Sequence, residues 1–348
     1  PRVQGRGGCD AENRVYTLTL SQHCGPTLGQ PVKEPFVIPV AMGLVAHDGR
    51  NLNLHLEGEA MPIGHNTVLV LSEPVQTFTF VHVPVEPVPS LLRGFSAPVV
   101  LEAELGDDAL FTLLAHDLDP FNRWEAAQKL ALRRMLAAVQ GNGHVEVDAR
   151  FIDAFRAILR HPELDAAFKE LVLTLPSEAY VAEQLVVVDP QRIHEVREGL
   201  KLQLAHALHE DWAWAYEHHQ DTGGYSPDPV SAGRRALTNL ALSMLVLHDT
   251  VRGNPIWTGK TIQRFKDAAN MTDRLGALAA LVHAHSDLAQ AALDRFHALF
   301  KDEALVIDKW FALQASASEK NGQVFARCKA LLQHPDFTLR TPNRARSL

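Results

Sequence analysis

The sequence pattern changes over one stretch, Pro84-Val-Glu-Pro-Val-Pro-Ser-Leu-Leu-Arg-Gly-Phe-Ser-Ala-Pro-Val-Val-Leu-Glu-Ala-Glu-Leu105. Before it, apolar and polar residues alternate in segment after segment, which is the period of a β-strand. After it, apolar residues recur at every third and fourth position, which is the period of an α-helix. The four prolines of the stretch lack a backbone donor, so they suit an edge strand or a crossover. We expect Val99–Leu105 to form one last strand before a helix opens at Gly106-Asp107-Asp108.

Length and composition predict an ordinary globular protein of more than one domain. The chain has 348 residues, of which 46% are hydrophobic and 21% charged, and this length favours two or more domains. The net charge of −8 is spread evenly: six Lys and Arg stand against ten Asp and Glu as far as Leu105, and 27 against 31 beyond it. Neither part has the basic surface that nucleic acid or an anionic membrane requires, so we expect neither as a partner.

Cysteine usage indicates a reducing, cytoplasmic setting. Cys9, Cys24 and Cys328 are too few and too scattered for a disulfide framework or a thiolate metal site. No apolar run approaches the roughly 18 residues of a membrane span, and no signal peptide is visible. The chain opens on Pro1 without an initiator Met and ends at Leu348 without a helix-stop signal, so we expect it to be truncated at both ends.

The first part of the chain, residues 1–105, predicts a small β-sandwich of immunoglobulin-like size. Its candidate strands are Val15–Leu20, Phe36–Ala46, Leu52–Leu56, Val68–Leu71, Phe78–Val81 and Val99–Leu105. An Asp48-Gly49 pair between the second and third of them is a hairpin signal. Six or seven short strands at this spacing favour an antiparallel sandwich. The histidines of this part are dispersed singly, so we expect no site there.

The remainder, residues 106–348, predicts an all-α superstructure. Helix starts are marked by Asp107-Asp108, Asp119-Pro120, Asp148, Ser177-Glu178 and Asp189-Pro190, and a loop by Thr222–Pro227. Roughly ten helices with short connections suggest stacked pairs in an irregular α-solenoid, because no strict repeat period is evident. A superstructure of this kind presents a concave face to a partner, a ligand or another domain.

The helical part contains 13 of the chain's 18 histidines, but no strong metal motif. The zinc-peptidase motif H-E-x-x-H is absent, because His194-Glu195-Val196-Arg197-Glu198 carries Glu where the second imidazole must lie. His206 and His209 are spaced to share one helix face with Glu210, and a third imidazole from His218 or His219 would complete a metal site. An exposed polar helix face beside Trp212 and Trp214 is the favoured interpretation, so we predict no metal ligands in this chain.

Other catalytic motifs are missing as well. Gly253–Thr261 approaches a phosphate-binding loop, but it has one residue too many and follows a helix instead of a strand. No Gly-x-Ser-x-Gly motif is present, and no cysteine lies in the context of a nucleophile. From its residues alone the chain predicts a non-catalytic module of a β domain and a helical domain.

Several stretches resemble the family of bacterial aminopeptidase N (alanyl aminopeptidase). They cover the chain in the order of the family: Pro89–Val99, Phe121–Gln128, Ala269–Asp273, Asp308–Gln314 and Thr341–Leu348. Members of this family are zinc-dependent enzymes that remove N-terminal residues from peptides. The resemblance implies that residues 1–105 are the small β-sandwich of such an enzyme, and residues 106–348 its C-terminal helical domain, truncated at its end.

The resemblance also implies a role without catalysis. The family's zinc ligands and exopeptidase motif belong to a catalytic domain that is absent here, so no catalytic residue or zinc ligand is expected in this chain. The partners implied are the catalytic domain of the same polypeptide and peptide substrates, with the helical domain capping the active-site cavity. Arg346, and after it Arg344, match a stretch that lines this cavity, where a guanidinium can bind a peptide carboxylate. The alternative is a stand-alone β-plus-helical scaffold for protein partners.

Overall fold

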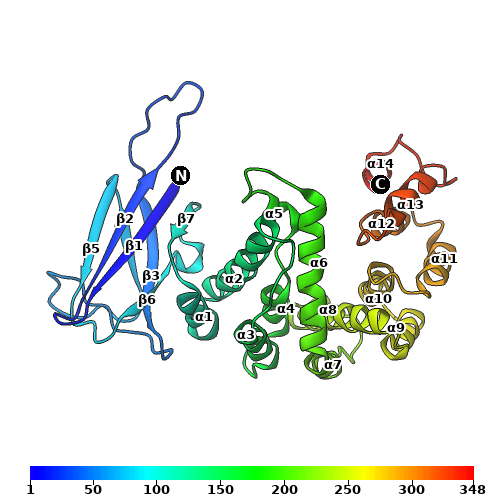
Figure 1. Cartoon of the computed structure of the whole chain (residues 1–348), viewed down its shortest axis with the longest axis horizontal. Coiled ribbons are helices and arrows are strands. Elements are labelled where there is room, and N and C mark those ends of the chain that lie inside the picture. The colour runs from blue at the N-terminus through cyan, green and yellow to red at the C-terminus, as the bar shows by residue number, and fades with distance from the viewer. The chain divides into compact units, whose positions relative to one another are not determined.

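The computed structural model describes all residues, 1–348, and divides into two compact units, Pro1–Arg134 and Met135–Leu348. The first unit contains a β-sandwich, and the second is entirely helical (Figure 1). This confirms the predicted fold class of an immunoglobulin-like sandwich followed by a helical superstructure. None of the helices combines the length and the apolar character that crossing a bilayer demands.

The sandwich is made of seven strands in two sheets. They are β1 (Arg2–Asp10), β2 (Val15–His23), β3 (Ile38–Ala46), β4 (Thr67–Leu71), β5 (Val75–Phe80), β6 (Pro87–Leu91) and β7 (Val100–Ala103). One sheet has the order β5-β2-β1-β7 and the other β4-β3-β6. Their facing sides form one core, in which Leu18, Val40, Leu44 and Phe80 are fully buried. The loop of residues 24–37 extends away from both sheets (Figure 1).

Two details of the sandwich differ from the sequence prediction. β1 was not predicted, although it pairs along its whole length with β2 and runs parallel to β7. Leu52–Leu56 was predicted as a strand and is not one. Leu52 and Leu54 are buried as the alternation requires, but Leu52 N–H donates to Leu44 O and Leu54 N–H to Gly64 O. Hydrogen bonds that go to separate segments form no continuous ladder.

The proline-rich stretch becomes an edge strand, as predicted. β6 pairs only with β3, so Pro87 and Pro89 lie where one side of the strand needs no donors. A short 3₁₀ turn, Arg93–Phe95, then reverses the chain, with Leu92 and Gly94 at φ values of 57° and 62°. The turn leads to β7 and to α1 (Asp107–His116), whose first turn carries the two expected acidic residues.

The boundary between the two units lies within α2 (Pro120–Gln140), and the helical unit begins with the last residues of that helix. Its helices are α3 (Ala149–Arg160), α4 (Ala166–Leu173), α5 (Glu178–Ala182), α6 (Pro190–Ala207), α7 (His209–His218), α8 (Pro229–Arg252), α9 (Ile256–Asp267), α10 (Met271–His283), α11 (Ala289–Phe300), α12 (Ala304–Ala315), α13 (Gln323–Leu331) and α14 (Pro342–Arg346). With α1 and α2 this makes fourteen helices, more than the ten predicted.

Several helix starts were correctly predicted because a side chain caps them. Asp148 and Asp189 each accept a hydrogen bond from the backbone N–H three residues ahead, at 2.9 and 3.1 Å. Asn270, which was not predicted as a helix start, caps α10 in the same way at 2.9 Å. The longest helix, α8, contacts α4, α6, α7, α9 and α10, and its residues Leu242 and Leu245 are fully buried. α8 is therefore the centre of the helical core.

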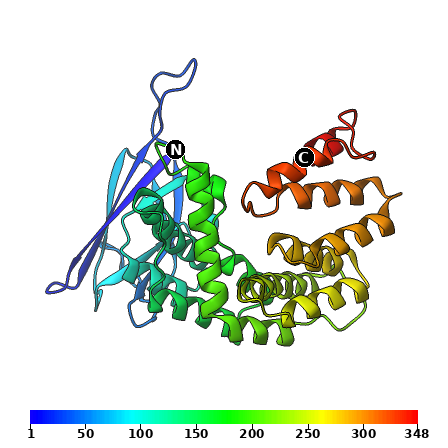
Figure 2. The same ribbon diagram turned by 45° about the vertical axis from the view of Figure 1, so that its right-hand side comes forward.

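The helices after α8 curve back toward α6. In Figure 2 the yellow and orange helices, α9 to α12, follow a bend that returns toward the green helix α6. Ser318, in the connection after α12, donates a hydrogen bond of 3.1 Å to Glu198 of α6. An open cavity there measures about 1260 Å³ and is lined mainly by α6, α8, α10 and residues 315–328.

Candidate functional site

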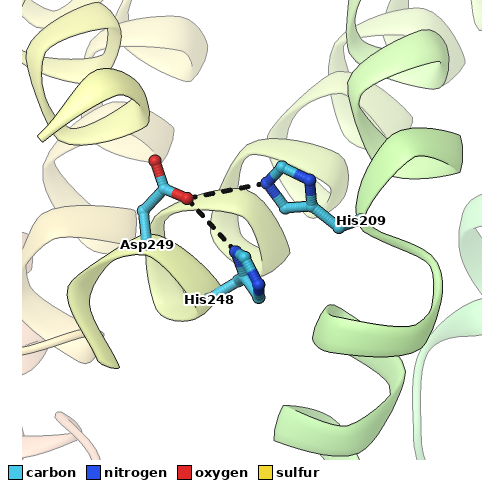
Figure 3. Close-up of side chains that lie close together, drawn as sticks. All are labelled: His209, His248 and Asp249. Atoms are coloured by element: carbon cyan, nitrogen blue, oxygen red, sulfur yellow. Dashed lines mark hydrogen bonds and ion pairs between the residues drawn. The ribbon is translucent and has the colours of Figure 1, made fainter. Parts of the chain in front are cut away.

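A cluster of two imidazoles and one carboxylate lies where α7 begins and α8 ends. His209 is the first residue of α7, whereas His248 and Asp249 lie in the last turns of α8. The Oδ1 atom of Asp249 is 3.5 Å from His209 Nε2 and 3.2 Å from His248 Nδ1. Figure 3 shows both rings directed at this one oxygen. The rings of His209 and His248 are 4.2 Å apart between centroids.

Asp249 is completely buried, and its two oxygens have separate roles. The Oδ2 atom accepts a hydrogen bond of 3.0 Å from the backbone N–H of Trp257, in the first turn of α9. This contact serves as the N-cap of α9, because the preceding Pro255 has no capping side chain. The Oδ1 atom is left for the two imidazoles. The carboxylate is thus fixed in orientation by one helix and presented to two side chains.

The electrostatics of the cluster favour a neutral His209. Burial lowers the pKa of His209, and the nearby His248 lowers it further, against the opposing effect of Asp249. The Nε2 atom of His209 is buried and has no hydrogen-bond partner, because Asp249 Oδ1 is at the limit of hydrogen-bonding distance. A buried ring nitrogen without a partner is costly unless it acts as an acceptor for something else.

The structure separates the histidines that the sequence pattern grouped. The helix breaks at Leu208, so His206 lies in the last turn of α6 and His209 begins α7. The expectation that the two share one continuous helix face was therefore wrong. His206 is exposed and stacks on His248 at 5.4 Å between ring centroids. His218 and His219, at the far end of α7, bond back to the carbonyls of Trp214 and Ala215.

Two further sequence candidates take structural roles. Gly253 is the left-handed C-cap of α8, with φ of 69°, and Lys260 and Thr261 lie inside α9, so Gly253–Thr261 is no phosphate cradle. His194, the first residue of the incomplete zinc-peptidase motif, bonds to Glu178 Oε1 at 2.7 Å. For Gly253–Thr261 this agrees with the predicted connection between helices.

The two arginines assigned to peptide binding differ in their surroundings. Arg344 is buried and anchors α14: its guanidinium bonds to Asp308, to the Asp336 carbonyl and, at 3.2 Å, to the Ala304 carbonyl. It also lies over the ring of Phe311, at 5.1 Å from the centroid. These contacts occupy its donors within the fold. Arg346, two residues further along the chain, is exposed to solvent.

The cavity of the helical unit has a charged side, which is formed by α6. Arg197, Glu198 and Lys201 project from α6, and the side chain of His283 comes from α10. Burial lowers the pKa of Lys201. Burial and, next, the charge of Lys201 lower the pKa of His283 to about 4. Sequence reasoning missed this group, because its members are up to 86 positions apart and no short motif joins them.

Sequence reasoning also missed the pairing of His209 with His248 and Asp249. The dipeptide His248-Asp249 lies near the end of a long apolar helix, about 40 residues after His209. The only available signal was the capping pattern: Asp249 lies just before a helix break at Gly253-Asn254-Pro255, where a carboxylate can cap the following helix.

Comparison with known families covers nearly the whole chain. Residues 107–348 match the family model described as "Domain of unknown function (DUF3458_C) ARM repeats", and residues 1–104 match "Domain of unknown function (DUF3458) Ig-like fold". The crystal structure of Legionella pneumophila aminopeptidase A in complex with aspartic acid is similar with a TM-score of 0.83 and 26% identity. The similarity covers 100% of this chain and 39% of that structure.

Curated relatives give the same result. The chain is 35% identical to aminopeptidase N of Escherichia coli (strain K12), over 100% of its own length and 39% of the relative. It is 36% identical to aminopeptidase N of Caulobacter vibrioides, over 88% of its length and 34% of the relative. The chain thus spans about two fifths of the length of these relatives. It belongs to the aminopeptidase N family, in which its Ig-like and ARM-repeat domains form the C-terminal region.

Proposed function

We propose that this chain is the non-catalytic C-terminal part of a zinc-dependent aminopeptidase that removes N-terminal amino acids from peptides. The observation that supports this most is the match to aminopeptidase N along the entire chain but along only 39% of the relative. The remaining length of such an enzyme has to supply the zinc ligands, because this chain contains no H-E-x-x-H. The catalytic domain of the same polypeptide is accordingly the proposed partner.

Within such an enzyme the helical unit caps the active-site cavity and supports the bound peptide. The proposal is supported by the concave, charged cavity of about 1260 Å³ and by the exposed guanidinium of Arg346. A guanidinium pairs with a carboxylate through two parallel hydrogen bonds, so Arg346 can hold the C-terminus of a short peptide. The role of Arg344 is then to fix the short helix that carries Arg346, through its bonds to Asp308 and two carbonyls.

The test is an activity assay of the purified 348-residue chain with alanyl-p-nitroanilide. We expect no hydrolysis above the rate without protein, in parallel with aminopeptidase N of Escherichia coli as the active reference. Hydrolysis by this chain that a chelator abolishes would overturn the proposal, because the catalytic centre would then lie within it. A gene that encodes no H-E-x-x-H upstream of Pro1 would also overturn it and favour the stand-alone scaffold.

A further inference from the structure

We propose that His209, His248 and Asp249 form a binding site for one zinc-like divalent cation, which joins three helices of the helical unit. The site is distinct in its residues from the H-E-x-x-H centre of zinc peptidases, and the inference does not depend on the proposed function. Three observations carry it: the spacing of the donor atoms, the state of the Asp249 carboxylate and the unsatisfied nitrogen of His209.

The spacing of the donor atoms fits a small tetrahedral ion. Zinc lies about 2.0–2.1 Å from imidazole nitrogen and carboxylate oxygen, so two ligands of a tetrahedral ion are about 3.3 Å apart. The two contacts of Asp249 Oδ1 are 3.5 Å to His209 Nε2 and 3.2 Å to His248 Nδ1. All three donor atoms lie within 4.8 Å of one another.

The carboxylate of Asp249 already has the support that a ligand carboxylate needs. Ligating groups are commonly held by a second hydrogen bond that fixes their orientation. Here the Trp257 N–H holds Oδ2 at 3.0 Å and leaves Oδ1 directed at the histidines. Asp249 is fully buried near the C-terminal end of α8, where the helix dipole disfavours a negative charge. A bound cation compensates this buried charge.

The third observation is that His209 Nε2 is buried and has no hydrogen-bond partner. An imidazole that coordinates through this nitrogen satisfies it without a proton. The side chains of His209 and His248 are 29% and 15% exposed, so solvent reaches the site and can complete the coordination shell. Two imidazoles and one carboxylate are a donor set typical of zinc, whereas Mg²⁺ and Ca²⁺ prefer oxygen ligands throughout.

A second cluster in the helical unit is less suitable and serves as the control. His297 Nε2 is 2.6 Å from Asp336 Oδ2, which is shorter than the roughly 3.3 Å between two ligands of a tetrahedral ion, and His334 Nδ1 is 3.8 Å away. The carboxylate of Asp336 is 40% exposed, so it needs no buried cation for compensation. We therefore expect the first cluster, and not this one, to bind the ion.

Binding of the ion would link helix ends and stabilise the fold of the helical unit. His209 begins α7, His248 and Asp249 lie in the last turns of α8, and Asp249 caps α9 through Trp257. One ion therefore connects the ends of three helices that pack around the centre of the unit. Binding to the folded chain alone stabilises it against unfolding by mass action, so zinc raises the melting temperature.

The experiment uses the 348-residue chain after treatment with a chelator and dialysis. Zinc is titrated by calorimetry, and bound zinc is counted by mass spectrometry of the metal after gel filtration. We expect one equivalent, a higher melting temperature with zinc, and no competition from Mg²⁺ or Ca²⁺. His209→Ala and His248→Ala lose the equivalent and the thermal shift, whereas His334→Ala keeps both.

Asp249→Asn separates coordination from folding. The amide oxygen can still accept from Trp257 and cap α9, but the negative ligand is gone, so zinc affinity falls at least tenfold while the helical circular dichroism stays unchanged. The proposal is overturned if the unaltered chain retains no zinc, if His209→Ala still binds one equivalent, or if His334→Ala loses it. Binding of several equivalents that no single substitution removes indicates non-specific surface histidines and likewise overturns it.

Discussion

The buried ion pair between Arg93 and Asp117 gives the sharpest test of the first unit. Arg93 lies in the turn after β6 and is 8% exposed, and Asp117, at the end of α1, is 2% exposed. The guanidinium donates to Asp117 Oδ1 at 3.1 Å and to Ser90 Oγ at 2.7 Å, and also contacts Asn66. The pair ties the turn of the proline-rich stretch to the first helix.

Replacing Arg93→Met keeps most of the side-chain volume but leaves the carboxylate of Asp117 in the interior without its cation. Breaking one side of a buried ion pair costs about 3–5 kcal/mol, because an uncompensated charge remains. Asp117 is poorly placed to adapt, since its Oδ2 has no hydrogen-bond partner, and of its two nearby cations only Arg123 would remain. We expect a loss of about 3–5 kcal/mol in the free energy of opening the sandwich.

Hydrogen exchange read by mass spectrometry is the suitable assay, because it reports each unit separately. Peptides from β3 and β6 should lose protection in Arg93→Met, and peptides from α8 should not change. Arg133→Met is the matched control: Arg133 pairs with Asp107 at 2.8 Å, but both side chains are 43% exposed, so the loss should stay below about 1 kcal/mol.

A second substitution decides whether the buried charge is the cause. Adding Asp117→Asn to Arg93→Met removes that charge, so the double variant should be more stable than Arg93→Met by about 1–2 kcal/mol. If Arg93→Met costs less than about 1 kcal/mol, or if Asp117→Asn only adds to the damage, the argument from a buried pair is refuted.

Three other outcomes are expected. The pKa of His283 is lowered from 6.5 to about 4, so as the pH falls the imidazole is protonated in the unfolded chain before it is protonated in the folded one. The free energy of unfolding of the helical unit should therefore fall by up to about 3 kcal/mol between about pH 6.5 and pH 4. His283→Gln should flatten this part of the profile of stability against pH, and an unchanged profile would contradict the lowered pKa. Asp148→Ala removes the cap on Phe151 N–H and should destabilise α3 by about 1 kcal/mol, read from exchange of its first turn, with Asp148→Asn as the conservative control. In a polypeptide that includes the proposed catalytic domain, Arg346→Ala should raise KM for short peptides by about tenfold with kcat little changed, and should leave KM for alanyl-p-nitroanilide, which has no carboxylate, as it was; equal effects on both substrates would exclude a carboxylate contact.

The sequence was informative wherever one element carries its own signal. Val15–Leu20 shows the alternation of a half-buried strand, and β2 follows it. Asp148 and Asp189 mark helix starts in the sequence, because a capping side chain accepts a hydrogen bond from a backbone N–H only three residues away. The proline-rich edge strand was predictable for the same reason, since a missing donor is a local property of the residue.

The sequence was uninformative where the fold joins distant residues. β1 has glycines at positions 5, 7 and 8 and few apolar side chains, so nothing in it resembles a strand. A Cβ at Gly7 would lie 2.1 Å from the hydroxyl of Tyr16. Glycine is therefore required here because the Tyr16 side chain of β2 packs directly against β1, and this requirement leaves no alternation of apolar residues in the sequence. The cluster of His209, His248 and Asp249 depends likewise on how two helix ends meet, which spacing along the chain does not reveal.

The parallel pairing of β1 with β7 has a consequence for how the sandwich forms. Arg2 pairs with Val100 and Gly5 with Ala103, so the sheet closes only when β7, about a hundred residues after β1, has been synthesised. Pairing residues so far apart closes a long loop, and the chain loses the conformational entropy of that loop before the contacts stabilise the fold. Topologies of this kind therefore fold slowly. Until β7 arrives, β1 has one unpaired edge, which is open to pairing with another nascent chain. A chaperone or slow folding step would therefore act on the first unit during synthesis, well before the helical unit is complete.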